Sequence, residues 1–163
     1  MISHDQHFVN KSVCELGSGL GLVSILLDKM SCCRYVYATD GDDETMELLK
    51  ENIKSTSSSV RAHKLWWGED ADFVKVLENN QHDLKFDVLL AADVIYEEDQ
   101  FQPLIESVKS LLKNDGEFLL AFARRNVSVD KVLDYALSQG LTWAMLDAGL
   151  SGMEPIYSIR WQL

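Results

Sequence analysis

A carboxylate and three glycines lie close together near the start of the chain, in the segment Glu15–Gly21. Its pattern is E-x-G-x-G-x-G, and its glycine spacing does not match the dinucleotide fingerprint G-x-G-x-x-G. Glycines at a turn that opens a helix let the backbone approach a ligand closely and supply N–H donors. The carboxylate of Glu15 would repel a pyrophosphate but suits a ligand that carries an ammonium group. The segment predicts a ligand-binding turn, with an ordinary tight β–α turn as the alternative.

An aspartate follows the next stretch of β-forming residues. Asp40 lies 23 residues after Gly17, close to the spacing at which nucleotide-binding α/β domains place a carboxylate that binds both ribose hydroxyls. Helix capping is the alternative role for an acidic residue at this point. We assign capping to Asp42 or Asp43 and ribose binding to Asp40.

Two adjacent tryptophans, Trp66 and Trp67, close the third β-forming stretch. An indole at this edge of a sheet can pack against an adenine ring. Because neighbouring residues of a strand point to opposite sides, we expect one tryptophan in the core and the other at the ligand site. Core packing alone is the alternative.

Asp93 follows an almost continuous apolar run, residues 86–91, and opens the segment Asp-Val-Ile-Tyr that ends at Tyr96. An apolar run of this length is typical of a strand buried on both faces of a parallel sheet. A carboxylate at the end of such a strand is energetically out of place unless it binds something. Helix capping is the alternative, and Asp99, nearer to the next helix, explains that role better. We therefore predict that Asp93 is functional.

Strand and helix patterns alternate along the chain in the order expected of a doubly wound parallel sheet. The predicted strands are residues 13–16, 35–39, 60–66, 86–91, 117–123, 141–146 and 156–162. Helical spacing of apolar residues recurs at 22–30, 46–53, 73–77, 101–112 and 129–139. The last two strands have no helix between them and should be neighbours. Ligands of such sheets bind beyond the carboxyl ends of the strands, where the four candidate segments would meet.

Composition places the chain among globular domains. It has 163 residues, of which 47% are hydrophobic and 25% charged, which is enough apolar material for one continuous core. No apolar run approaches the roughly 18–20 residues of a membrane helix. The N-terminus has no basic region followed by an apolar one, so we expect no signal peptide and a cytosolic or nuclear protein.

The net charge bears on the kind of partner that the protein binds, and the cysteines bear on whether it binds a metal. The formal net charge is −11, which repels nucleic acid and fits a basic protein or peptide partner, although acidity can also serve solubility alone. The three cysteines, two of them adjacent at Cys32 and Cys33, share no metal-ligand spacing with the four histidines. We expect reduced thiols and no metal site.

These residues resemble the class I, seven-β-strand S-adenosylmethionine-dependent methyltransferases, and specifically their protein-lysine methyltransferase branch. The similarity runs from about Lys11 to the C-terminus. Its carriers are ELGSGLG, the pair Thr39-Asp40, LWWG and AADVIY, which matches the D-x-x-Y signature of that branch. The resemblance implies a Rossmann-like α/β fold with strand order 3-2-1-4-5-7-6 and strand seven antiparallel. It also implies methyl transfer to a lysine of a protein substrate, in a branch that acts on calmodulin, chaperones and translation factors.

The resemblance also implies site roles. Glu15, Gly17 and Gly19 would hold the methionine part of S-adenosylmethionine, Asp40 its ribose, and Trp67 with the Ala92 backbone its adenosyl portion. Ser18 and Gly41 complete the predicted cofactor site. Asp93 and Tyr96 would line the acceptor site as catalytic residues.

Other interpretations stay open from the sequence. Residues 1–163 are predicted to form a single methyltransferase domain that is a monomer. Members of the family usually have some tens of residues before the first strand, and this domain is predicted to lack that N-terminal extension. A catalytically silent Rossmann-like binding module and a methyltransferase of a small-molecule acceptor are the main alternatives. A nicotinamide dehydrogenase is disfavoured by Glu15 and by the glycine spacing.

Overall fold

A computed structural model of the chain describes residues 7–30, 32–56, 58–122, 127–146 and 155–162. The strands form one seven-stranded sheet with the order β3-β2-β1-β4-β5-β7-β6. β7 runs antiparallel to β5 and β6, and the other neighbouring strands are parallel. The strands are β1 (Ser12–Leu16), β2 (Tyr35–Asp40), β3 (Arg61–Lys64), β4 (Phe86–Ala92), β5 (Leu112–Ala121), β6 (Leu141–Leu146) and β7 (Ile156–Trp161). This arrangement confirms the predicted fold class and strand order.

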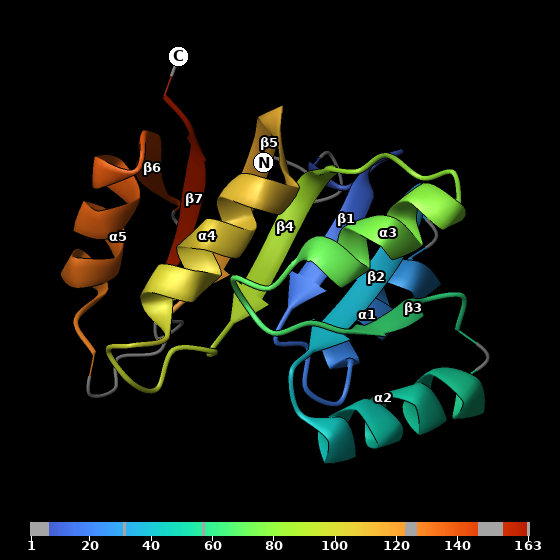
Figure 1. The fold of residues 1–163 in the computed structure, drawn as a ribbon. Helices are drawn as coiled ribbons and strands as arrows, with labels where there is room; N and C mark the ends of the chain where they lie inside the picture. Colours follow the sequence, from blue (N-terminus) through green and yellow to red (C-terminus); the bar gives the residue numbers. More distant parts are fainter. Residues whose placement is uncertain (1–6, 31, 57, 123–126, 147–154, 163) are drawn as a thin grey trace.

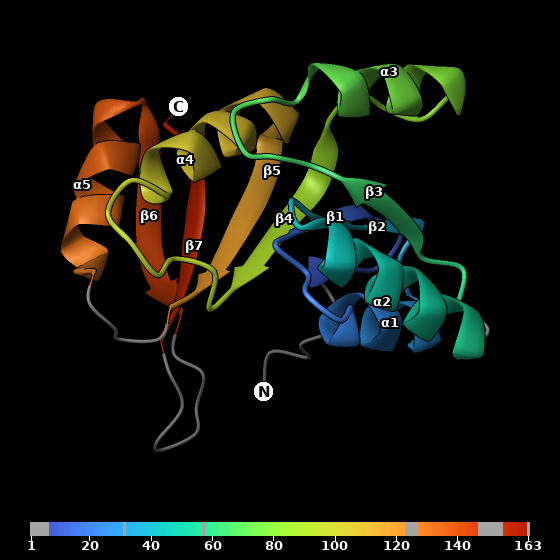
Figure 2. The ribbon, with the colours of Figure 1, turned by 60° about the horizontal axis from the view of Figure 1, so that its bottom comes forward.

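Five helices cover the two faces of the sheet (Figures 1 and 2). They are α1 (Leu22–Lys29), α2 (Asp43–Ser55), α3 (Ala71–Asn79), α4 (Phe101–Leu111) and α5 (Val129–Ser138). α1 and α2 pack on one face, and α3, α4 and α5 pack on the other. Both faces of the central strands are therefore buried, as in other doubly wound sheets.

The central strand β4 is apolar except at Asp87, whose carboxylate is held by Ser12 and Lys113. Leu89 and Ala91 belong to the core cluster under α3, α4 and α5, whereas Val88 and Leu90 belong to the cluster under α1 and α2. Successive side chains of a strand alternate between its faces, so a strand covered on both sides is apolar at most positions. The two clusters together hold the carboxyl end of β4 at the middle of the sheet.

The largest differences from the predicted strand boundaries are in β5 and β3. β5 begins at Leu112, directly after α4, rather than at residue 117, because Leu112 is fully buried and pairs with Phe86 across a shift in the β4–β5 register. β3 covers residues 61–64 rather than 60–66. The backbone N–H of Leu65 still donates to the Asp40 carbonyl, after which the chain leaves the sheet.

The helix ends test the capping assignments. The Asp42 carboxylate accepts a hydrogen bond from the Thr45 N–H at 2.8 Å, so Asp42 caps α2 as one of the two candidates predicted. The assignment of Asp99 as the cap of α4 is wrong, because Gln100 holds that position. The side chain of Gln100 bonds the preceding loop and makes no capping bond to the helix.

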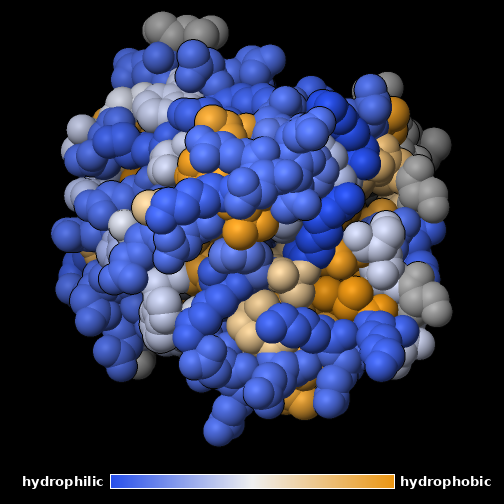
Figure 3. Space-filling view, turned by 45° about the vertical axis from the view of Figure 1, so that its right-hand side comes forward, coloured by the Kyte–Doolittle hydropathy of each residue, from blue (hydrophilic) through white to orange (hydrophobic). Residues whose placement is uncertain are grey.

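Hydrophilic residues cover most of the face drawn in Figure 3, and apolar residues show in patches between them. Among the described residues, no helix is long and apolar enough to cross a membrane. The same residues contain no group of three or more potential metal-binding side chains.

A buried carboxylate fastens the antiparallel strand β7 to β5. Glu117 is 7% exposed and accepts hydrogen bonds from Ser158 and from Arg160, whose Nη2 lies 2.6 Å away. His7 Nδ1 lies 2.9 Å from its other oxygen. Burial by itself raises the pKa of Glu117, but these hydrogen bonds and the Arg160 charge outweigh it, so the pKa lies below its ordinary value.

Glu117→Gln should lower the free energy of unfolding by about 2 kcal/mol at neutral pH, because charge-assisted hydrogen bonds are lost. A carboxyl whose pKa is lowered by folding stabilises the protein above its unfolded-state pKa, and this contribution disappears as the pH falls through the folded-state value. The gap between the two proteins, measured by urea unfolding from pH 7 to pH 3, should therefore close towards acid. Asp72→Asn is the control, because Asp72 pairs with Lys75 at an exposed site, where an ion pair contributes little to stability. A gap that is independent of pH would contradict this account.

Candidate active site

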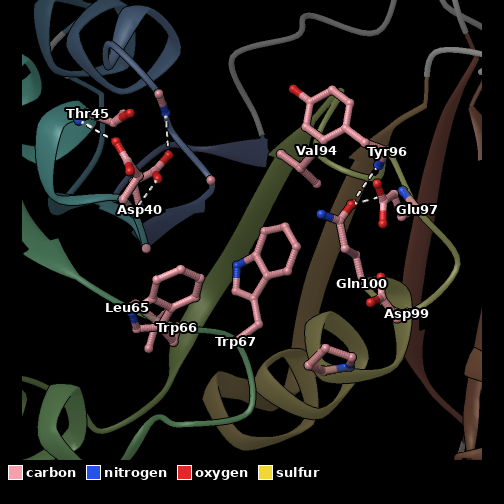
Figure 4. A pocket seen from close by; sticks show the side chains of 15 residues that line it. Asp40, Thr45, Leu65, Trp66, Trp67, Val94, Tyr96, Glu97, Asp99 and Gln100 are labelled. Carbon is pink, nitrogen blue, oxygen red and sulfur yellow. Dashed lines mark hydrogen bonds between the residues drawn. The ribbon is translucent and has the colours of Figure 1, made fainter.

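A cavity of about 580 Å³ opens beyond the carboxyl ends of β1, β2, β3 and β4. Figure 4 shows the side chains that line it, which come from the turn after each of these strands and from the start of α4. The lining residues are Gly17, Gly19, Asp40, Gly41, Asp42, Thr45, Leu65, Trp66, Trp67, Val94, Tyr96, Glu97, Asp99, Gln100 and Pro103. The four segments singled out in the sequence thus meet at one place.

The turn after β1 contributes Gly17 and Gly19 to the cavity wall, both with positive φ, 71° and 52°. A Cβ on Gly17 would lie 2.8 Å from Val94 Cγ1 and 3.2 Å from Trp67 Cζ2, so a side chain has no room there. A Cβ on Gly19 would meet nothing within 4 Å. The backbone at Gly19 is therefore open to close approach by a ligand.

Asp40, the last residue of β2, connects the surrounding turns. One carboxylate oxygen accepts the Gly19 N–H at 3.0 Å, and the other accepts the Asp42 N–H at 3.1 Å (Figure 4). Each carboxylate oxygen has a second lone pair, so Asp40 retains the capacity to accept hydrogen bonds from two hydroxyls. This geometry suits the ribose role predicted for it.

Glu15 and Ser18 lie behind the cavity wall. Glu15 is 4% exposed, and its Oε2 accepts hydrogen bonds from the Ser24 N–H at 3.0 Å and the Ser24 hydroxyl at 2.5 Å. Burial raises the pKa of Glu15, an effect that the bonds from Ser24 reduce in part. Ser18 is 9% exposed, and its hydroxyl has no hydrogen-bond partner among the described residues. Neither side chain lines the cavity, so their contact with a cofactor stays a prediction.

Both tryptophans lie at the cavity, which differs from the expected division between core and site. Trp66 is 58% exposed and covers Gly41, where a Cβ would lie 3.0 Å from the indole ring. Trp67 is partly buried against the main core cluster and also faces the cavity. The chain has already left β3 at this point, so the alternation of a strand no longer applies.

The loop between β4 and α4 forms the opposite wall. Asp93 has φ of 53°, a conformation that aspartate tolerates better than most residues, and its N–H donates to the Ala121 carbonyl. After this bend, Ile95 enters the core, while Val94 and the half-exposed Tyr96 line the cavity. Ala92 and Asp93 themselves are not among the lining residues.

The charged residues of the cavity wall all carry the same sign. They are Asp40, Asp42, Glu97 and Asp99, and no lysine, arginine or histidine lines the described cavity. Hydrogen bonds from Thr45 lower the pKa of Asp42, which keeps this carboxylate ionised. The cavity is therefore suited to a ligand with positive charge.

Sequence reasoning missed several wall residues, among them Trp66, Val94, Glu97 and Gln100. All of them lie within four residues of a predicted site residue, and no feature of residue type or spacing distinguishes Val94, Glu97 and Gln100. Trp66 had a usable signal, because the Trp-Trp pair was recognised but only Trp67 was assigned to the site.

A glycine turn after β1, an acid at the end of β2 and a cavity at this edge of a 3-2-1-4-5-7-6 sheet define a Rossmann-like domain of the class I methyltransferase type. The fold is similar to that of a ribosomal protein L11 methylase from Lactobacillus delbrueckii subsp. bulgaricus, with a TM-score of 0.69 and 21% identity over 94% of this chain and 70% of that one. A methyltransferase from Pyrococcus furiosus has a TM-score of 0.68 with 18% identity over 95% of this chain and 76% of that one. These likenesses show the fold.

Sequence comparison shows the family. Residues 2–138 match the family described as lysine methyltransferase, and the chain belongs to it. It is 27% identical to a calmodulin-lysine N-methyltransferase of Arabidopsis thaliana over 89% of this chain and 48% of the relative. It is 32% identical to the protein N-lysine methyltransferase METTL21A of Mus musculus over 68% of this chain and 48% of that protein. The chain spans about half the length of these two relatives.

Gly17 can be required for two reasons, its positive φ and the lack of space for a side chain. A comparison of Gly17→Ala with Gly140→Ala separates these two reasons. Both residues have positive φ, 71° and 82°, but a Cβ on Gly140 would meet nothing within 4 Å. Gly140→Ala should lower the free energy of unfolding by about 1 kcal/mol from backbone strain alone. Gly17→Ala should lower it by about 3 kcal/mol, because overlap with Val94 and Trp67 is added. Urea unfolding of both variants provides the measurement, and equal losses would contradict the close packing at Gly17.

Proposed function

We propose that this chain transfers a methyl group from S-adenosylmethionine to a lysine side chain of a protein. Membership of the lysine methyltransferase family supports the reaction class. The observation that carries the proposal is that one cavity joins Asp40, the predicted cofactor residue, to Tyr96 of the D-x-x-Y segment. Donor and acceptor would therefore meet in one space.

The cavity wall fits the chemistry of S-adenosylmethionine. Asp40 would accept hydrogen bonds from the ribose hydroxyls, and the indole of Trp67, with the Ala92 backbone, would lie beside the adenosyl portion. Gly19 leaves space for the ligand, whereas Gly17 lies against Val94 and Gly41 lies under Trp66. The buried Ser18 hydroxyl offers an unused hydrogen-bonding group. The carboxylates of the wall, with Glu15 behind it, favour the ammonium and sulfonium charges of this cofactor.

The protein's own contribution is chiefly placement. When bound, the cofactor supplies an activated methyl group, which an amine attacks in line with the departing sulfur. A lysine side chain has a reference pKa of about 10.4 and must lose a proton to water before it attacks. The carboxylate of Asp93 would accept hydrogen bonds from the amine and orient it, and the Tyr96 ring would stabilise the cation on either side of the reaction.

The direct test is incubation of the purified chain with methyl-labelled S-adenosylmethionine and a lysate of its own source. Label in a discrete protein band, which disappears when lysines of the acceptor fraction are blocked beforehand, would support the proposal. Label that enters only small molecules would favour the small-molecule alternative. No label in any fraction would favour a silent binding module.

Substitution of Asp93 should impair methyl transfer, whereas substitution of Asp40 should impair cofactor binding. Asp93→Ala should abolish methyl transfer while the Kd for S-adenosylmethionine changes by no more than about threefold. Asp93→Asn should be equally inactive, because it retains the residue type that tolerates positive φ and removes only the charge. Asp40→Ala should raise the cofactor Kd about tenfold or more, the effect of lost ribose hydrogen bonds. Isothermal titration and initial rates separate the two, and a similar rise in Kd in all three variants would contradict the assignment.

Glu97 and Asp99, the carboxylates of the β4–α4 loop that line the cavity, should attract the lysine of the acceptor. The double variant Glu97→Gln, Asp99→Asn should raise the KM for the acceptor protein several-fold at low salt, and the difference should shrink at high salt because exposed charges are screened. Glu98→Gln is the matched control on the same loop, because Glu98 pairs with Lys131 and does not line the cavity. An equal effect of the control would show a general charge effect rather than one of the cavity wall.

The finer parts of the proposal follow from the family and from the charge of the chain. The acceptor would be a protein with a basic segment, in the class of calmodulin, chaperones or translation factors on which this branch acts. The net charge of −11 argues against a nucleic-acid acceptor. We further propose a single catalytic domain that acts as a monomer in the cytosol or nucleus.

A further inference from the structure

Gln100, at the start of α4, makes an unusual set of contacts. Its side-chain Oε1 accepts hydrogen bonds from two consecutive backbone N–H groups, that of Tyr96 at 2.7 Å and that of Glu97 at 3.1 Å (Figure 4). Its own N–H donates to the Glu97 carbonyl at 3.3 Å. Side chain and backbone together close the segment from residue 96 to residue 100 into a compact loop.

The orientation of the Gln100 carboxamide follows from its partners. Both partners are N–H donors, so the atom that faces them must be the carbonyl oxygen rather than the amide nitrogen. In Figure 4 the nitrogen is turned away from the loop and towards the cavity. The oxygen of Gln100 therefore serves the loop.

The loop lies between two anchored segments. Ile95, directly before it, is buried in the core, and α4 after it is anchored by a stripe of buried side chains, namely Phe101, Leu104, Ile105, Val108 and Leu111. Between these anchors, Tyr96 is 48% exposed and Glu97 is exposed. Burial of these two side chains contributes little to their placement, whereas Gln100 connects their backbone directly to the anchored helix.

We propose that Gln100 is a positioning residue for the acceptor, which acts by holding the backbone of Tyr96 and Glu97 so that both side chains face the cavity. This inference rests on the proposed function for its effect on methyl transfer, and its structural part can be tested without any reaction. A free loop would present Tyr96 and Glu97 in many orientations, and the acceptor would have to order them on binding. Loss of the clamp should therefore weaken use of the acceptor more than binding of the cofactor.

The first arm of the test measures hydrogen exchange of the backbone amides of Tyr96 and Glu97 in the full chain. Gln100→Met, which keeps the length of the side chain and removes the acceptor, should speed exchange of both amides about tenfold. Gln100→Glu retains an acceptor oxygen and should preserve their protection. Gln102→Met is the matched control, the same change at an exposed position of the same helix that does not line the cavity. Unchanged exchange in Gln100→Met would overturn the clamp.

The second arm measures methyl transfer. Gln100→Met should raise the KM for the acceptor protein about tenfold, with the S-adenosylmethionine Kd within about threefold of that of the unchanged chain. Gln100→Glu should largely restore the acceptor KM, and Gln102→Met should leave it unchanged. Faster exchange with an unaltered KM would overturn the positioning role and leave a purely structural one. Failure of the unchanged chain to methylate anything would overturn the proposed function and the effect on the acceptor together, while the exchange arm would still decide whether Gln100 holds the loop.

Discussion

The carboxylate of Asp40 accepts two backbone hydrogen bonds at the carboxyl edge of the sheet. One comes from the glycine turn after β1, and the other comes from the residue that caps α2. Its own carbonyl accepts the Leu65 N–H at the end of β3. One residue thus fixes three connections that follow neighbouring strands. These connections carry the glycines, the capping Asp42 and both tryptophans, so the shape of this half of the cavity depends on the hydrogen bonds that Asp40 accepts. Charged acceptors make stronger hydrogen bonds than neutral ones, which suits a carboxylate for this task.

Within the part of the chain that the structure describes, three carboxylates of this region, Asp40, Asp42 and Glu15, form no ion pair. Asp40, Asp42 and Glu15 are bound by backbone N–H groups or by a serine hydroxyl rather than by lysine or arginine. Neutral donors satisfy the oxygens but do not cancel their charge, and the negative potential at the cavity therefore persists. Glu117 is the opposite case, because Arg160 neutralises it at a position that only has to join two strands. The difference between these two kinds of carboxylate separates a ligand-binding role from a structural one.

The strands and helices could be predicted from the sequence because they depend on local patterns, whereas the strand order followed from the family resemblance. Apolar runs and helical spacing located the strands and helices that the structure describes. The ends of two predicted strands suggested Asp40, which lines the cavity, and Asp93, which does not. Contacts between segments could not be predicted from the sequence. Nothing in the sequence indicates that Gln100 bonds back to Tyr96 instead of leaving Asp99 to cap α4, or that Trp66 folds over Gly41. These features depend on the path of the chain after each strand ends, where no periodic pattern constrains it.

An apolar contact between Val94 and Gly17 joins the two halves of the cavity. Val94, the residue that follows Asp93, packs so closely on Gly17 that any side chain there would collide with it. The left-handed conformation of Asp93 directs Val94 against the glycine turn, and two residues later the chain presents Tyr96 to the cavity. The turn predicted to hold the cofactor and the loop predicted to hold the acceptor are therefore packed against each other. If the turn or the loop shifts by a fraction of an ångström, its partner has to shift as well, because close-packed groups leave no empty space between them. The rate of methyl transfer depends on the alignment of the methyl donor with the acceptor. Because of this contact, the position of the turn that would hold the cofactor and the position of the loop that would hold the acceptor depend on each other.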